Sequence, residues 1–242
     1  MKTLLQIWMK SSLLTIVLVN TSLKAKSNEI GDITNAYLAR DIVALEEIKA
    51  QLPSELSYEV AYVNYRLALT LMLNEKKADA EILLNKAEAI LTEREVENSS
   101  LDYSLLASVY SLKAGMGMFS GPVNGKKSSD SILKAQKLDR QNPQIWLVKG
   151  LSAYHTPKVF GGSDNKAIQF FNKAIALYSN DMDRAVYWGL EEALVWRAIL
   201  HKKNGHEEEA IKDLERALHY RKNFPWAKEL LVKFSTKKEL PL

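Results

Sequence analysis

A short pattern of small and large residues recurs four times along this chain and constrains its fold more than any other feature. Each copy has a small residue, a large apolar residue four positions later, and a second small residue three positions after that. Spacings of three and four place all three side chains on one face of a helix. The small residues let a neighbouring helix approach closely, and the large one fills the gap. The four copies are Ala80-Leu84-Ala87, Ser128-Ile132-Ala135, Ala167-Phe171-Ala174 and Ala210-Leu214-Ala217.

The remaining segments also have the residue spacing of helices, and none alternates strictly enough to predict a strand. Ser99 and Asp102 form a capping-box pattern at one helix start, and Gly205 is placed to end another helix in the left-handed conformation. Two glycine- and proline-containing stretches, 115–125 and 156–164, are predicted to be loops. The sequence therefore predicts an all-α fold with helices over 33–52, 58–73, 77–91, 99–118, 128–138, 144–154, 165–178, 184–204, 206–220 and 225–234.

The recurring pattern is typical of the second helix of a tetratricopeptide-type hairpin, which buries its apolar face by stacking on the next hairpin. The marker positions 80, 128, 167 and 210 lie 48, 39 and 43 residues apart, against about 34 in the regular repeat. HEAT-like repeats of about 40–47 residues are the alternative. We expect a right-handed solenoid with irregular repeats. It has an N-terminal helix within 26–57, hairpins over 58–222, and a capping helix and tail over 223–242.

The first 25 residues have the layout of a secretory signal peptide. Lys2 and Lys10 make a basic start, Ser11 to Val19 form an apolar run, and a polar segment leads to a cleavage point after Ala25. The apolar run is about half of the ~20 residues that span a bilayer, although a retained membrane anchor is the alternative. We expect a periplasmic or secreted mature chain that does not span the membrane.

Composition excludes several function classes. The chain has no cysteine, which excludes disulfides, thiolate nucleophiles, zinc–cysteine sites and a lipoprotein anchor. Without the signal segment, 30 basic residues face 29 acidic ones, since Lys2, Lys10 and Lys24 leave with it. A net charge near +1 predicts neither nucleic-acid binding nor general attraction to anionic membranes.

No pattern in the sequence assembles a catalytic or metal site. Gly121-x3-Gly125-Lys126-Lys127-Ser128 misses the spacing of a P-loop. His201 and His206 are five residues apart across a helix break, which does not suit a helical zinc pair. Glu191 and Glu192 are adjacent on a helix and point about 100° apart. We therefore expect a protein that is not an enzyme and has no cofactor or metal.

Aromatic residues supply the candidate binding sites. A concave groove lined by first helices is expected to bind a protein or peptide partner, with Tyr65, Tyr110, Trp146, Tyr154 and Trp188 as its lining. Alternatively, a pocket beneath the 156–164 loop would hold a small ligand against His155, Phe160 and Trp188. Core packing is the simpler role for each of these aromatic rings.

A string of residues in the second half resembles a family of exported tetratricopeptide-like proteins common in Bacteroidota. The string is Asn142-Pro143, Gly150, Thr156-Pro157-x-x-Phe160-Gly161-Gly162, Ala167 and Trp188-Gly189-x-x-Glu192-Ala193. The Pro-x-x-Phe-Gly-Gly turn also resembles one in the T component associated with tripartite solute transporters. The first resemblance implies the fold and an exported location, and brings no catalytic residues. We expect a non-catalytic periplasmic adaptor, with a small-ligand-binding accessory protein of a solute transport system as the alternative.

Overall fold

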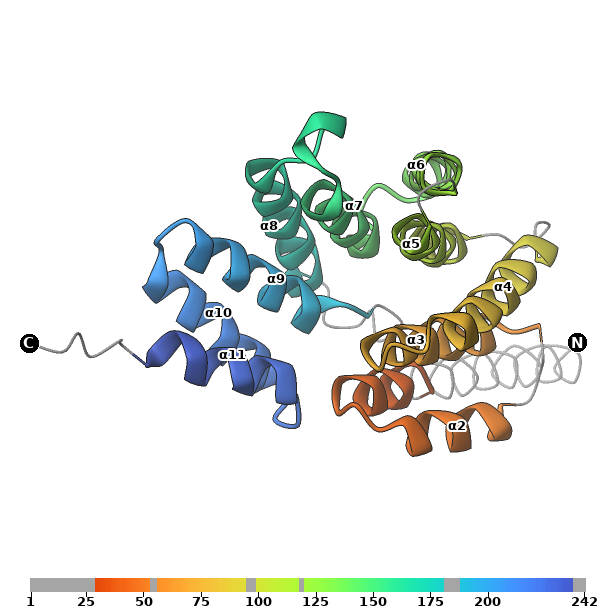
Figure 1. Cartoon of the computed structure of the whole chain (residues 1–242), viewed down its shortest axis with the longest axis horizontal. Coiled ribbons are helices and arrows are strands. Elements are labelled where there is room, and N and C mark those ends of the chain that lie inside the picture. Colours follow the sequence, from red (N-terminus) through yellow and green to blue (C-terminus); the bar gives the residue numbers. More distant parts are fainter. Residues whose placement is uncertain (1–28, 53–55, 95–98, 118–119, 181–187, 237–242) are drawn as a thin grey trace, which may run out of the picture.

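The computed structural model describes residues 29–52, 56–94, 99–117, 120–180 and 188–236, and within them the secondary structure is entirely helical. The helices follow one another around an arc that turns back on itself (Figure 1). A helix over 29–38 is followed by α2 (Ile42–Gln51), α3 (Tyr58–Leu73), α4 (Lys77–Glu93), α5 (Ser100–Met116), α6 (Gly121–Leu138), α7 (Pro143–His155), the 3-10 turn η1 (Lys158–Phe160), α8 (Asp164–Asn180), α9 (Leu190–Lys203), α10 (Glu207–Tyr220) and α11 (Pro225–Ser235).

Four consecutive hairpins make up most of the array: α3 with α4, α5 with α6, α7 with α8, and α9 with α10. The four copies of the sequence pattern lie on α4, α6, α8 and α10, the second helix of each hairpin, and all twelve residues are buried. The third hairpin shows why the pattern works. Gly150 of α7 lies so close to Phe171 of α8 that a Cβ at residue 150 would sit 2.4 Å from the Phe171 ring. The predicted all-α hairpin solenoid is confirmed.

The single helix predicted over 33–52 is wrong, because the chain reverses at residues 39–41. Arg40 adopts a positive φ of 59°, and the Asp41 side chain caps α2 by accepting a hydrogen bond from the Ala44 amide at 2.9 Å. The apolar periodicity continues across this turn, because the helices on both sides of it pack against the α3 region. The periodicity therefore concealed the turn.

The loop predicted over 115–125 is also partly wrong, because α6 begins at Gly121. Pro122 lies in the first turn, where its missing amide N–H costs no helical hydrogen bond. The predicted loop over 156–164 contains η1. The helix predicted over 184–204 begins at Leu190 as α9, after Gly189 at φ 107°; its predicted residues 184–187 lie outside the described residues.

Other local predictions agree with the structure. Ser99 and Asp102 form the capping box of α5, and Gly205 takes a positive φ of 82° between α9 and α10. Over the described residues, no helix is both long and apolar enough to cross a membrane. The expected signal peptide, 1–25, lies outside the described residues.

The two ends of the described array touch. Arg40, in the turn before α2, donates two hydrogen bonds to the Glu229 carboxylate of α11, at 2.8 and 3.0 Å. This contact places the N-terminal helices opposite α9–α11, across the inside of the arc.

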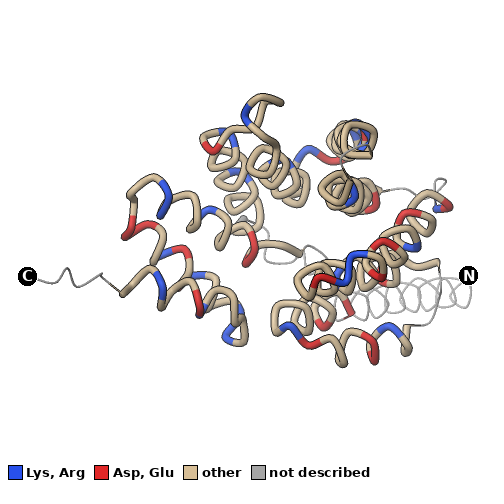
Figure 2. Tube along the Cα trace, viewed as in Figure 1, with Lys and Arg blue, Asp and Glu red and all other residues tan. Residues whose placement is uncertain are grey.

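Acidic and basic residues are interspersed along the helices (Figure 2).

Candidate functional site

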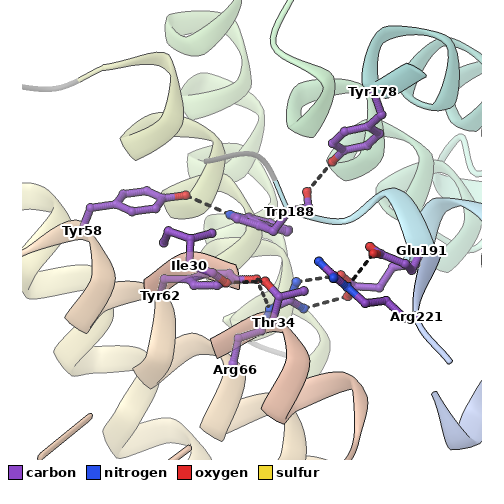
Figure 3. Close-up of polar contacts among 10 residues, drawn as sticks. Ile30, Thr34, Tyr58, Tyr62, Arg66, Tyr178, Trp188, Glu191 and Arg221 are labelled. Atoms are coloured by element: carbon purple, nitrogen blue, oxygen red, sulfur yellow. Dashed lines mark hydrogen bonds and ion pairs between the residues drawn. The ribbon is translucent and has the colours of Figure 1, made fainter. Parts of the chain in front are cut away.

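The inside of the arc contains a buried ion pair between residues that are far apart in the sequence. Arg66 of α3 is fully buried and donates to both carboxylate oxygens of Glu192 in α9, at 2.7 and 2.6 Å. Its guanidinium carbon also lies 4.2–5.5 Å from the centroids of four aromatic rings. We call this group the central cluster: Arg66, Glu192, Tyr37, Tyr62, Tyr65 and Trp188. Figure 3 shows Arg66, Tyr62 and Trp188 of this cluster.

The charge of Arg66 is kept by its partners. Burial alone would lower its pKa, but the nearby Glu192 carboxylate outweighs this effect and raises the pKa well above its usual value. A buried cation is tolerated when a carboxylate and aromatic faces replace the lost water. The ion pair and the rings together therefore form one unit that holds α3 against α9.

Trp188 extends this unit to the middle hairpins. Its ring stacks on Tyr62 with centroids 5.3 Å apart, and its indole nitrogen donates to the Tyr58 hydroxyl at 2.9 Å. The Gln144 amide of α7, oriented with its oxygen toward the indole, lies 2.7 Å from the same nitrogen. The Tyr178 hydroxyl of α8 donates to the Trp188 carbonyl (Figure 3). Trp188 thus joins α3, α7 and α8 just before α9 begins.

A second group of aromatic side chains crosses successive hairpins and remains partly accessible. Trp196 of α9 lies with its ring centroid 5.1 Å from those of both Tyr154 and His155, at the end of α7, and 5.2 Å from that of Trp226 in α11. His155 is exposed, and the other three rings are half-buried. We call these four residues the aromatic ladder. Although His155 remains exposed at the surface, the neighbouring rings remove part of the water around its imidazole, and this desolvation lowers the pKa of His155.

The aromatic ladder and the central cluster project from related positions on α9. Trp196 follows Glu192 by four residues, so the two side chains leave nearly the same face of the helix. The Trp196 ring also contacts rings of α7, in the hairpin before α9–α10, and of α11, the helix after it. The aromatic ladder is therefore a continuous apolar strip built from three elements.

The predicted site residues separate into several places. Tyr65 and Trp188 come together in the central cluster, with their rings 6.0 Å apart, and both are buried. Burial raises the pKa of Tyr65 to about 12. Tyr154 and His155 come together in the aromatic ladder.

Three predicted residues lie apart from these groups. Tyr110 is buried, with Lys127 5.0 Å from its ring centroid. Trp146 packs on Phe170, at 6.0 Å between centroids. Phe160 lies on η1 and is 79% exposed. His155, Phe160 and Trp188 do not line one pocket, because Trp188 is covered by α3 side chains while Phe160 faces solvent.

Arg66, Glu192, Trp196 and Trp226 belong to these groups but were not among the predicted site residues. One signal for Arg66 was available: it is the only charged residue between Glu59 and Glu75, within an apolar helix. Glu191 and Glu192 do diverge as predicted, since Glu191 pairs with Arg221 at 2.8 Å. The curvature of the whole array determines which acidic residue pairs with Arg66. No local sequence pattern predicts that this residue is Glu192, 126 positions away.

Two arrangements that bind metals or nucleotides are lacking among the described residues. Among them, no three histidine, aspartate or glutamate side chains are placed to hold a metal ion. The P-loop-like stretch 121–128 lies within α6 and follows another helix, so the strand–loop–helix context of a P-loop is lacking there.

Comparison with known proteins identifies the fold. The structure of TTC0263, a thermophilic TPR protein from Thermus thermophilus, matches with a TM-score of 0.53 over 86% of this chain and 98% of its own, at 16% identity. The fold is that of a tetratricopeptide-repeat protein. The HusA haemophore from Porphyromonas gingivalis has a TM-score of 0.49 over 75% of this chain and 93% of its own, at 21% identity.

Sequence comparison gives a shorter match. The Photosystem I assembly protein Ycf3 of Prochlorococcus marinus (strain NATL2A) is 29% identical over 94 residues, which are 38% of this chain and 48% of Ycf3. The chain thus spans about half the length of this curated relative. No protein-family model matches the chain.

Proposed function

We propose that this protein is a non-catalytic adaptor that binds a protein or peptide partner. The tetratricopeptide-repeat fold supports this proposal, because stacked hairpins leave an extended surface for binding. The short match to a protein named for its role in assembly is consistent with it. We further propose that segment 1–25 exports the chain to the periplasm, and that the chain is one of the exported tetratricopeptide-like proteins of Bacteroidota that it resembles.

The aromatic ladder is the observation on which this proposal rests. Tryptophan and tyrosine dominate the energetics of protein interfaces, because they bury a large apolar area and lose little conformational entropy. Tyr154, Trp196 and Trp226 keep part of their surface accessible, and His155 is exposed. By contrast, the rings of Tyr65, Tyr110 and Trp188 are already covered by the chain itself. We therefore place the partner on the Tyr154–His155 side of the predicted groove.

A peptide-display experiment tests this placement. The chain starting at Lys26 is the bait for a library of linear peptides, and enriched peptides are measured by fluorescence anisotropy. If they are hot-spot residues of the interface, the variants His155→Ala and Trp226→Ala weaken binding at least tenfold, since truncating a hot-spot residue costs about 2 kcal/mol or more. Trp146→Ala is the matched control, because Trp146 is also half-buried but packs on Phe170 outside the aromatic ladder.

Melting temperatures separate binding from folding. His155 is exposed, so His155→Ala is expected to weaken binding and leave the melting temperature unchanged. Trp226 and Trp146 both pack against the core, so Trp226→Ala and Trp146→Ala are expected to lower the melting temperature; weaker binding by Trp226→Ala alone, below both melting temperatures, identifies a contact residue. If no peptide is enriched and the native envelope fraction yields no partner, the adaptor proposal is wrong. Peptides that bind all three variants equally would move the contact away from the aromatic ladder.

A further inference from the structure

The most exposed apolar side chains of the described chain are neighbours at the tip of one turn. Val159 is 85% exposed and Phe160 79% exposed, and η1 projects from the outer edge of the α7–α8 hairpin (Figure 1). Two adjacent bulky apolar side chains in solvent are unfavourable, since each keeps a large apolar surface in contact with water. Such a pair calls for an explanation outside the folded chain.

The tip is held in place and does not fold back to hide these side chains. The amides of Phe160 and Gly162 donate to the Pro157 carbonyl at 2.8 and 3.2 Å, and the Ser163 amide donates to the Ala153 carbonyl at 2.8 Å. Gly161 has a φ of 95°, and a Cβ at Gly162 would lie 1.7 Å from the Thr156 carbonyl oxygen. The turn is thus tied to the end of α7 with Val159 and Phe160 outside.

Basic side chains lie beside this tip. Lys158 is adjacent to Val159, and Lys166 is exposed in the first turn of α8. Lys203 of α9 reaches the same place, because its ammonium lies 2.6 Å from Asp164, the first residue of α8. Asp164 is the one acidic residue between 140 and 180, and its charge is balanced by Lys203. Lys158 and Lys166 therefore add two positive charges beside the tip, although the chain is nearly neutral.

We propose that Val159 and Phe160 insert into the surface of an anionic lipid bilayer, with the neighbouring lysines on its headgroups. A convex tip of two side chains is too small for a stable protein interface, which buries about 800 Å² on each partner. A bilayer requires no complementary shape, and apolar side chains beside lysines suit its interface. This contact is weak and reversible, and it orients the array at the membrane. It does not depend on the proposed adaptor function.

Vesicle binding tests the proposal directly. All described helices lie between 29 and 236, so a chain starting at Lys26 keeps the array and removes the apolar N-terminal run. Its partitioning is measured by flotation with phosphatidylcholine vesicles, with and without phosphatidylglycerol. We expect binding only to the anionic vesicles, weakened by salt, and a loss of about tenfold in V159S/F160S. L73S/V232S is the matched control, because Leu73 and Val232 are similarly exposed on α3 and α11.

A unique label reports the insertion itself. Since the chain has no cysteine, V159C carries the only reactive thiol for an environment-sensitive dye, and L73C gives the control position. We expect a blue shift on adding anionic vesicles for the dye at residue 159 alone. The proposal is overturned if V159S/F160S floats like the wild type, or if the wild type does not float at low salt. It is also overturned if V159S/F160S loses a peptide partner while neither protein binds vesicles, since the tip would then be a protein anchor.

Discussion

At the scale of single residues, a fully buried arginine needs partners that replace water around its charge. Arg66 has Glu192 as a bidentate partner and four aromatic rings around it. Removing one member of a buried pair leaves the other charged and uncompensated. We expect Arg66→Met to lower the free energy of unfolding by about 3–5 kcal/mol, measured by urea denaturation, and R66M/E192L to recover a large part of it. The exposed Arg40–Glu229 ion pair is the control, and Arg40→Met should lower the free energy of unfolding by less than about 1 kcal/mol. Equal losses for R66M and the double variant would contradict this account.

At the scale of elements, the hairpins depend on how closely their helices approach. A methyl group at Gly150 would meet the buried Phe171 ring at 2.4 Å, whereas a methyl group at Gly125 of α6 would meet nothing within 4 Å. We expect Gly150→Ala to destabilise the protein by about 1–2 kcal/mol through overpacking. Gly125→Ala should stabilise it by about 0.5–1 kcal/mol, because alanine favours helix more than glycine does. Thermal and urea unfolding of both variants measure these opposite changes in the free energy of unfolding. A stabilised G150A would show that α7 and α8 can move apart without loss of stability.

At the scale of the whole molecule, contacts between distant repeats change how the array unfolds. In a solenoid each repeat contacts only its neighbours, and the ends can open alone. Here the Arg66–Glu192, Tyr58–Trp188 and Arg40–Glu229 contacts join residues 126, 130 and 189 positions apart. We expect native-state hydrogen exchange to give α3 and α9 the same opening free energy. In R66M/E192L, α9–α11 should open at a lower free energy than α3. Earlier exchange of α9–α11 in the wild type would show that these contacts do not couple the ends.

Most helices could be predicted because their signals are local. The marker residues Ala80, Leu84 and Ala87 share one turn-by-turn pattern, and Pro225 and Gly205 act through their own backbone geometry. The break at Arg40 was missed because the apolar period continues through it. The start of α6 at Gly121 was missed because glycines and a proline also suit a loop, and only packing on α5 favours the helix there.

The candidate sites were predictable only as residue types. Aromatic residues were correctly seen to gather in the second half, but their exposure depends on which neighbours cover them. Trp188 is buried by tyrosines of α3, about 130 positions earlier, while Phe160 is left outside by a tied turn. Trp196 and Trp226 form a partly accessible strip only because the fold brings the rings of Tyr154, Trp196 and Trp226 into contact.

The sequence by itself determined the all-α hairpin array, because the residues that pack each hairpin recur at spacings of three and four along a single helix. It also excluded cysteine chemistry through composition. Only the tertiary structure decided that the array curves until its ends meet, and that Arg66 pairs with Glu192. Only it decided which aromatic rings keep accessible surface. The physical reason is that curvature accumulates from small rotations between successive hairpins, so contacts across the inside depend on every hairpin together.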